Sequence, residues 1–167
     1  MFSVGDTVVY GTQGVCLIVE IKRMKIGKET KDYFVLRPAA DQGAVVYVPC
    51  GSAALAAKMR SLISRGELDR LINEAAAEPA EWIADDNARL AHCDEVLKSG
   101  DRKRLLQLVV MLYRRRELLK ATKKHFHNAD ATYLKAAERL LHDEFAYVLG
   151  IGAEEVPDYI RERIENA

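Results

Sequence analysis

Basic residues are concentrated in one stretch of the sequence, with a spacing that could serve phosphate binding. Positions 102–124 hold nine basic residues and only one acidic residue. Residues eleven apart on a helix project in nearly the same direction, which places Arg104 with Arg115 on one face. By the same spacing, Lys103 and Arg114 fall together on an adjacent face. Such a basic ridge suits the backbone of a nucleic acid, because each neutralised phosphate adds affinity that is independent of base sequence.

Trp82, the only tryptophan of the chain, is the second candidate for this chemistry. It follows Pro79, which predicts the beginning of a helix, and its polar neighbours include Asp85 and Asp86. An exposed indole at the start of a helix could stack on an unpaired base or wedge beside it. Contacts of this kind are worth about 1 to 3 kcal/mol per base.

Each feature also has a purely structural interpretation. A lone tryptophan in a helical domain is often part of the core. A basic helix face is often solvated or paired with acidic neighbours, and nine acidic residues lie between positions 67 and 95. From the residues alone, nucleic-acid binding and a structural role both remain open.

Two kinds of scaffold are predicted to position these side chains. Positions 4–49 are rich in Val, Ile and Tyr and are interrupted by glycines, which is typical of short strands joined by tight turns. Four strands are expected, over positions 7–10, 15–24, 33–37 and 44–48, with a hairpin tip at positions 26–28. A small, strongly bent sheet is therefore predicted for a first domain, residues 1–51.

From Ser52 onward helix formers dominate, and a second, all-helical domain is predicted for residues 52–167. Ser64 and Glu67 match a capping box, Asp101 caps a longer helix and Asn128 caps another. The expected helices cover positions 64–77, 79–99, 101–122, 128–149 and 156–164. The predicted fold class is α+β, with a β domain followed by a helical bundle.

Composition limits the classes of function. Lys and Arg together number 25, as do Asp and Glu, so any attraction to nucleic acid must be local. No apolar run approaches the roughly 20 residues that span a bilayer, and no leader pattern opens the chain, so a cytoplasmic protein is expected. Cys16, Cys50 and Cys93 are odd in number and widely spaced, which favours a reducing compartment.

Signals for catalysis or metal binding are weak. His92 and Cys93, and likewise His125 and His127, are metal-ligand types, but no second pair follows at a zinc-like spacing. The stretch 11–14 lacks the Lys-Ser/Thr ending of a phosphate loop and reads as a turn. No catalytic residue, metal, cofactor or small-molecule substrate is predicted, and the chain is expected not to be an enzyme.

The order of several motifs resembles one known family over essentially the whole chain. The segments 2–10, 14–15, 33–36 and 46–49 (FSVGDTVVY, GV, YFVL and VYVP) look like the RNA polymerase-interacting domain of CarD proteins, which also occurs in the transcription-repair coupling factor. The segments 81–82, 98–101, 112–115 and 137–149 resemble the C-terminal helical domain of CarD. The coupling factor lacks that helical domain, so the combination favours CarD.

This resemblance implies a division of labour. The first domain, a bent sheet or Tudor-like barrel, would bind the RNA polymerase beta subunit by adding its edge strand to a strand of the partner. The expected polymerase contacts are Met24, Ile26, Val46 and Tyr47. The helical domain would contact promoter DNA at the upstream edge of the melted bubble, with Trp82 as the wedge and Arg115 on the backbone. The other expected DNA contacts, largely independent of sequence, are Arg89, Lys103, Arg104, Arg114, Lys123 and Lys124.

The sequence departs from the family pattern directly after the tryptophan. Basic residues commonly follow there, whereas this chain has residues 84–87 (ADDN) and only Arg89 remains as a cation. An alternative function is therefore retained: an adaptor that binds proteins through its β domain and does not touch DNA. An exposed Trp82 beside Arg104 and Arg115 would favour DNA contact, whereas a buried Trp82 and a ridge neutralised by acidic side chains would favour the adaptor.

Overall fold

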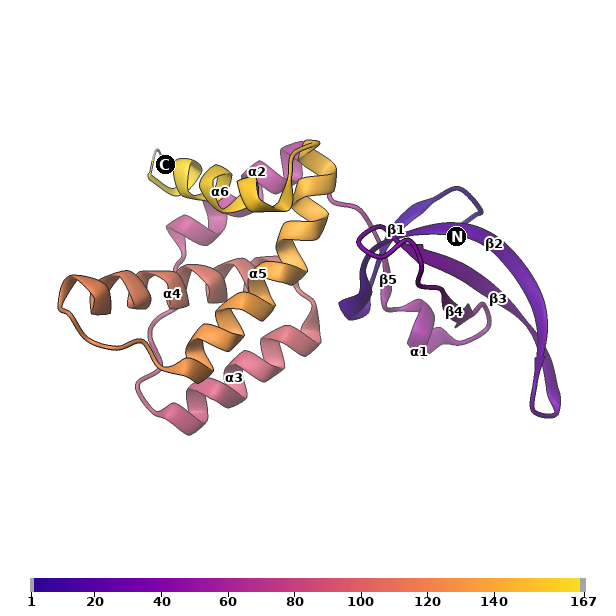
Figure 1. Ribbon diagram of the computed structural model, residues 1–167, viewed down its shortest axis with the longest axis horizontal. Helices are drawn as coiled ribbons and strands as arrows, with labels where there is room; N and C mark the ends of the chain where they lie inside the picture. Colours follow the sequence, from indigo (N-terminus) through magenta and orange to yellow (C-terminus); the bar gives the residue numbers. More distant parts are fainter. Residues whose placement is uncertain (1, 166–167) are drawn as a thin grey trace. The chain divides into compact units, whose positions relative to one another are not determined.

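The computed structural model describes residues 2–165, and the chain divides between Ile63 and Ser64 into two compact units. The first unit is an antiparallel five-stranded sheet and the second is a set of helices (Figure 1). The predicted α+β class, with a strand domain followed by a helical domain, is confirmed.

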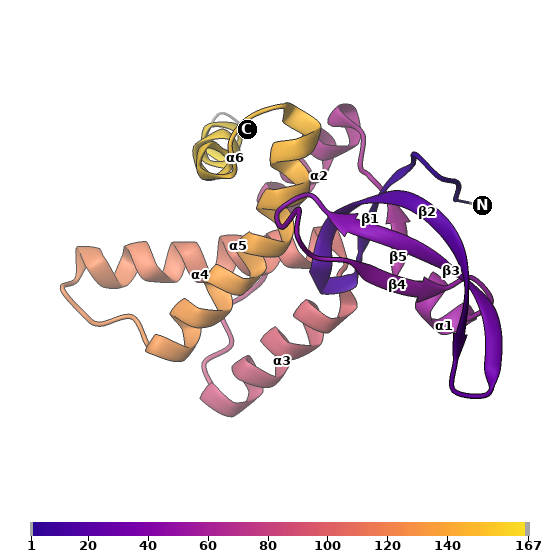
Figure 2. The ribbon, with the colours of Figure 1, turned by 45° about the vertical axis from the view of Figure 1, so that its right-hand side comes forward.

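Strands β1 to β5 form the sheet in the order β4-β3-β2-β1-β5, so β4 and β5 are its edges. Their bounds are Thr7–Tyr10, Gly14–Ile26, Glu29–Pro38, Val46–Pro49 and Met59–Ser61; a 3-10 turn, η1, covers Gly11–Gln13 and the short helix α1 covers Ala53–Ala56. A β-bulge between Ile18 and Glu20 shifts the register of β2 against β3. The two long strands end in a hairpin tip that projects beyond the rest of the sheet (Figures 1 and 2). Gly27 adopts a φ of 66° there, a conformation that a β-hairpin turn favours and that glycine adopts without strain.

One face of the curved sheet closes over an apolar core. Its buried members are Val8, Cys16, Ile18, Phe34, Leu36, Val48 and Met59. They come from all five strands, so every strand contributes a side chain to this core.

The first unit extends further than the expected boundary at residue 51. Strand β5 pairs with β1, matching Val9 with Arg60, and Met59 is only 5% exposed within the core. This strand also corrects the expectation that residues 52–167 are entirely helical. Three residues at a sheet edge are too few for a periodic pattern, and the alanine-rich segment before them favours helix.

The second unit contains five helices among the described residues, α2 to α6, and a short 3-10 turn. Their bounds are Arg65–Ala77, Asp86–Ser99, Arg102–Ala121, Asn128–Leu149 and Val156–Glu165, with η2 at Ala153–Glu155. The capping box of Ser64 with Glu67 and the cap at Asp101 are present as predicted. The N-cap of α5 is His127, without a side-chain hydrogen bond, instead of Asn128. Helix α4 packs against α5 and α2, and α6 packs against α2 and α5.

The largest difference from the predicted helices lies before α3. The helix expected from Pro79 begins only at Asp86, because the Asp85 carboxylate caps it by accepting a hydrogen bond from the Ala88 N–H at 2.8 Å. Residues 79–84 therefore form a non-helical segment, and Trp82 lies in that segment instead of on a helix. This segment positions the candidate site.

Candidate functional site

Trp82 lies between two guanidinium groups. It is half-buried, and its ring centroid is 4.4 Å from Cζ of Arg89 in α3 and 4.9 Å from Cζ of Arg115 in α4. Both distances are within the range of a cation–π contact. The indole is therefore neither an ordinary core residue nor a fully exposed one: two cations fix it at the surface of the helical unit.

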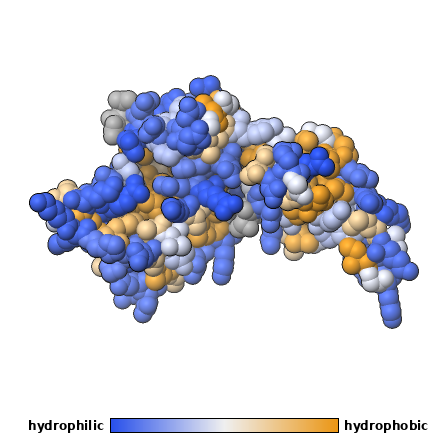
Figure 3. Space-filling view, in the orientation of Figure 1, coloured by the Kyte–Doolittle hydropathy of each residue, from blue (hydrophilic) through white to orange (hydrophobic). Residues whose placement is uncertain are grey.

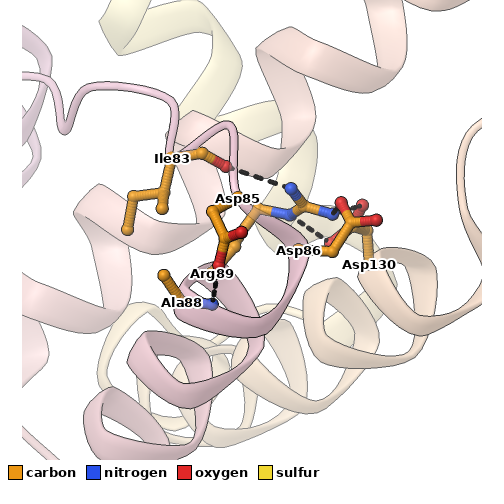
Figure 4. A network of polar contacts seen from close by, with 6 residues as sticks. All are labelled: Ile83, Asp85, Asp86, Ala88, Arg89 and Asp130. Atoms are coloured by element: carbon orange, nitrogen blue, oxygen red, sulfur yellow. Dashed lines mark hydrogen bonds and ion pairs between the residues drawn. The ribbon is translucent and has the colours of Figure 1, made fainter.

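Arg89 fixes the segment that carries the tryptophan (Figure 4). Its Nε donates to Oδ1 of Asp130 at 2.8 Å and its Nη2 to Oδ2 of the same carboxylate at 3.1 Å. The remaining bonds run from Nη2 to Asp86 at 2.8 Å and from Nη1 to the carbonyl oxygen of Ile83 at 3.0 Å. One side chain thus ties the backbone next to Trp82 to α3 and to α5. These four residues, Ile83, Asp86, Arg89 and Asp130, are called the Arg89 network below.

The Arg89 network corrects the expectation that Arg89 contacts DNA. Arg89 is 2% exposed and Asp130 is 1% exposed, so this guanidinium offers no free face to a phosphate. The hydrogen bonds that Arg89 donates to the Asp130 carboxylate raise the pKa of Arg89 above its usual value, which keeps the buried group charged. Its partner Asp130 lies 41 positions away, and no local sequence pattern could have paired them.

Carboxylates form ion pairs with the cations in the N-terminal half of the basic ridge. Lys103 Nζ lies 3.0 Å from Glu78, and Arg104 Nη2 lies 3.0 Å from Glu95. The hydrogen bond that Lys103 donates to the Glu78 carboxylate raises the pKa of Lys103. Arg104 is therefore not the partner of Trp82, and on an ideal helix it lies about 16 Å along the axis from Arg115.

Arg102, the first residue of the predicted ridge, points into the helical unit. Its Nε and Nη2 each donate to the Glu144 carboxylate at 2.6 Å. Glu144 in α5 is 2% exposed, so this bidentate pair is a connection between α4 and α5. It contributes no cation to the surface.

The C-terminal half of α4 has a different character. Arg114 is exposed, Arg115 contacts the Trp82 ring, and neither is in an ion pair with a carboxylate that the structure describes. Lys123 and Lys124, which follow the helix, are exposed and likewise without a carboxylate partner in the described part of the chain. Arg116 is paired with Glu117 at 3.5 Å. The expected DNA contacts therefore divide into a neutralised group and an available group.

The residues expected to contact polymerase lie in two places on the sheet unit. Val46 and Tyr47 belong to the edge strand β4, where Tyr47 is 48% exposed and Val46 packs partly against the core. Met24 and Ile26 lie near the hairpin tip, and Ile26 is 56% exposed. Tyr47 is opposite Val35 on β3 and Ile26 is opposite Glu29, a separation of about 20 Å along that strand.

Exposed apolar side chains not singled out from the sequence enlarge the sheet surface. They are Val4, Leu17, Ile21 and Val45, each at least 42% exposed. Hydrophobic surface is visible on the sheet unit in the space-filling view (Figure 3). Strand alternation could have indicated Leu17, which lies between the buried Cys16 and Ile18 on β2.

The histidines and cysteines make no evident reactive site. Burial raises the pKa of the Cys93 thiol to about 11, so this thiol stays protonated at neutral pH. Within residues 2–165, no three His, Cys, Asp or Glu side chains gather as a metal site would require. No helix in the same range is long and apolar enough to cross a membrane.

Comparison with protein families identifies the first unit. Residues 2–63 match the family model of the CarD-like/TRCF RID domain. The match ends where the first compact unit ends, so it includes β5 and the apolar core of the sheet. It covers less than half of the chain and does not extend into the helices that carry Trp82 and the basic ridge.

Proposed function

The chain is a CarD-like protein whose residues 2–63 form an RNA polymerase-interacting domain, and on this premise we propose that it regulates transcription by contacting promoter DNA while bound to polymerase. The domain implies interaction with the polymerase beta subunit, and domains of this family are non-enzymatic protein-interaction domains. The proposal adds two parts: the mode of polymerase binding and the DNA contact at the upstream edge of the melted bubble.

For polymerase binding, β4 is the proposed docking strand. It lies at the edge of the sheet and so presents main-chain groups that a strand of the beta subunit can pair with. The exposed Tyr47 on β4 supplies side-chain contact beside that new pair of strands. Met24 and Ile26 would form a second contact region at the hairpin, well separated from the first.

For DNA, the proposal rests on one observation: the half-buried indole of Trp82 is stacked against Arg115, which no described carboxylate neutralises. An aromatic ring at the surface beside a cation can meet an unstacked base and the adjoining phosphate together. The Arg89 network holds the backbone behind the ring, so the ring does not have to be ordered on binding. Arg114, Lys123 and Lys124 add sequence-independent attraction.

The effect on transcription follows from differential binding. Insertion of a wedge costs unstacking energy, and it shifts the equilibrium toward melted DNA only if the open complex gains more contacts than the closed one. Trp82 would find an unpaired base only in the open complex. The protein should therefore lengthen the lifetime of open complexes.

One observation favours the alternative function, an adaptor that contacts only proteins. Lys103 and Arg104 of the ridge lie against Glu78 and Glu95, which reduces the positive potential that DNA would meet. Under this alternative, Trp82 and Arg115 would be structural, and only the sheet unit would bind a partner.

The experiment that decides is the lifetime of promoter open complexes formed by purified RNA polymerase after challenge with a competitor. Wild-type protein should lengthen this lifetime, and Trp82→Ala should abolish most of the gain while leaving polymerase binding unchanged. Tyr147→Ala is the matched control, since Tyr147 is an exposed aromatic residue of α5 that is not part of the site. Tyr47→Ala should instead weaken polymerase binding itself. If the wild-type protein binds polymerase but alters no step of promoter opening, the adaptor function replaces the DNA-contact proposal.

A further inference from the structure

The helical unit contains a cavity that shares only Arg114 with the residues of the proposed function. It measures about 250 Å³ and lies among α4, α5 and α6. Ligand pockets of drug-sized molecules usually measure about 300 to 1,000 Å³, so this cavity suits a smaller molecule. In Figure 3, hydrophobic surface shows between hydrophilic side chains in the region of α4 and α6.

The inner wall of the cavity is apolar. Val109 and Val110 from α4 and Ile160 from α6 are all buried, and Pro157 with Ile164 extends this wall along α6. No polar group of these side chains needs a partner, so water held against them makes few hydrogen bonds. An apolar ligand would displace such water favourably.

Three arginines also line the cavity. Arg114 and Arg116 come from α4 and Arg161 comes from α6. The Cζ atoms of Arg116 and Arg161 lie 5.3 and 5.6 Å from the ring centroid of Tyr113, which also lines the cavity. Two helices thus bring three cations to one cavity.

The acidic groups nearby do not neutralise all three cations. Arg116 is 3.5 Å from Glu117 and Arg161 is 3.5 Å from Asp158, whereas Arg114 is paired with no carboxylate of the described chain.

Two ionisable residues of α5, Glu138 and His142, also line the cavity, and neither reverses its charge. Burial raises the pKa of Glu138 and lowers the pKa of His142 to about 4, so the imidazole is neutral at pH 7. An uncharged imidazole beside the apolar wall can hydrogen-bond a ligand. Three guanidinium groups and one carboxylate therefore line the cavity, and Arg114 is in no ion pair with a described carboxylate.

We propose that this cavity binds a small apolar carboxylate, with the apolar body against Val109, Val110 and Ile160 and the carboxylate at Arg114 and Arg161. An apolar interior accounts for the body of the ligand, and planar guanidinium groups favour a carboxylate, which they can bind through two parallel hydrogen bonds. Trp82 and its contacts are not among the residues that line the cavity, so the proposal does not depend on DNA binding.

The test uses the full-length protein with methyl labels and a matched pair of probes, 1-naphthoate and the uncharged 1-naphthamide. Titration with 1-naphthoate should shift the methyl NMR signals of Val109, Val110 and Ile160 in a saturable manner. The signals of Ile18 and Leu36, in the core of the sheet unit, should not move. The amide has nearly the same shape without the charge, and we expect it to bind about tenfold more weakly.

Variants then test whether Arg114 and Arg161 cause the preference for the carboxylate over the amide. The double variant Arg114→Gln/Arg161→Gln should bind both probes with similar affinity. Arg104→Gln is the control, because Arg104 is on the same helix α4 but is paired with Glu95 and does not line the cavity. This control should keep the tenfold preference for the carboxylate.

Three results would overturn the proposal: no saturable shift at the cavity methyl groups, equal binding of amide and carboxylate to the wild type, or equal loss of preference in Arg104→Gln. Open-complex lifetimes are not part of this test, so failure here leaves the proposed function untouched.

Discussion

The two halves of α4 use the same residue types in opposite ways. At its N-terminal half, Arg102 and Arg104 lie against Glu144 and Glu95, and the first of these carboxylates is buried. At its C-terminal half, Arg114 and Arg115 are in no ion pair with a described carboxylate, and Arg115 lies against the Trp82 ring.

The difference shows that a count of charges along a helix does not locate a binding surface. Cations that face carboxylates hold helices together or sit in solvated pairs. The partners, which come from α2, α3 and α5, decide which cations remain for a ligand. The most direct test of the comparison is therefore to remove cations from either half of α4, or to remove the carboxylates that pair with them.

The largest effect is expected from removing the carboxylate partner of Arg89, the buried cation beside Trp82. Asp130→Ala removes both hydrogen bonds that the buried guanidinium of Arg89 donates to the Asp130 carboxylate. Arg89 then keeps only the exposed Asp86 as an anionic partner, and this loss of its buried partner should lower the free energy of unfolding of the helical unit by about 3 kcal/mol. Chemical denaturation followed by circular dichroism measures this change.

The control for Asp130 replaces both charges at once. In Arg89→Met/Asp130→Leu no buried charge is left unpaired, and the loss of stability should be much smaller than in the single variant. A single variant as stable as the wild type would show that the Arg89 network does not hold the segment carrying Trp82.

DNA affinity should separate the two halves of α4 next. Arg114→Gln/Arg115→Gln should weaken binding to duplex DNA by about tenfold at moderate salt, and the slope of log K against log salt should become shallower by about 2. Lys103→Gln/Arg104→Gln removes the same number of charges from the neutralised half. This second double variant should change the DNA affinity and the salt slope much less. Equal effects of the two double variants would contradict the proposal that only the C-terminal half of α4 has cations available for DNA.

Acid should weaken the packing behind the C-terminal half of α4. Burial lowers the pKa of His142 to about 4, whereas an unfolded chain titrates near 6.5. Between these values the unfolded state binds a proton and the folded state does not, so stability falls as the pH drops from about 6.5 to 4, by about 2 kcal/mol.

Other charged groups around His142 must be separated from its effect. Arg114 and Arg116 of α4 and Arg161 of α6 line the same cavity as His142. Glu138 has a raised pKa, and its contribution is the opposite: it is lost as the pH rises. Thermal unfolding of wild type and His142→Phe, measured across this pH range, isolates the contribution of the histidine. If the stability of the two proteins depends on pH in the same way, His142 is not the cause of the acid effect.

The smallest effect should come from Glu95→Gln, which makes Arg104 available. Glu95 is exposed, so the loss of this surface pair should change the free energy of unfolding by less than about 1 kcal/mol. Affinity for duplex DNA should rise by about twofold through the added cation. A decrease in DNA affinity would mean that Arg104 needs Glu95 to be positioned for a phosphate.

Local signals in the sequence predicted much of this fold. The cap of Ser64 with Glu67 and the cap at Asp101 form between residues three apart, and these two predictions were correct, whereas the N-cap expected at Asn128 is His127. The beginning of α3 was misplaced because Pro79 and Asp85 both give a start signal, and the cap at Asp85 determines where the helix begins. Tertiary pairings were beyond local patterns: no periodicity links Arg89 to Asp130 or Met59 to the sheet.

The candidate site was predicted only in part, because local patterns do not reveal which side chains pair in the tertiary structure. Trp82 and Arg115 were both singled out, and the structure brings them together. Arg104 was expected beside them from helical spacing, but spacing gives the direction of a side chain and not its partner. The sheet contacts Val46 and Tyr47 belong to an edge strand, which the alternating pattern alone could not have distinguished from a central one.

The bond from Arg89 to the Ile83 carbonyl has a consequence for the kinetics of association. Residues 79–84 lack helical hydrogen bonds, and such a segment would ordinarily lose conformational entropy when a ligand orders it. Here the buried guanidinium restrains the backbone beside Trp82 during folding, so little of that entropy remains to be lost at the DNA. Encounters with melted DNA should then proceed without a slow conformational step, with association limited by diffusion and ionic strength.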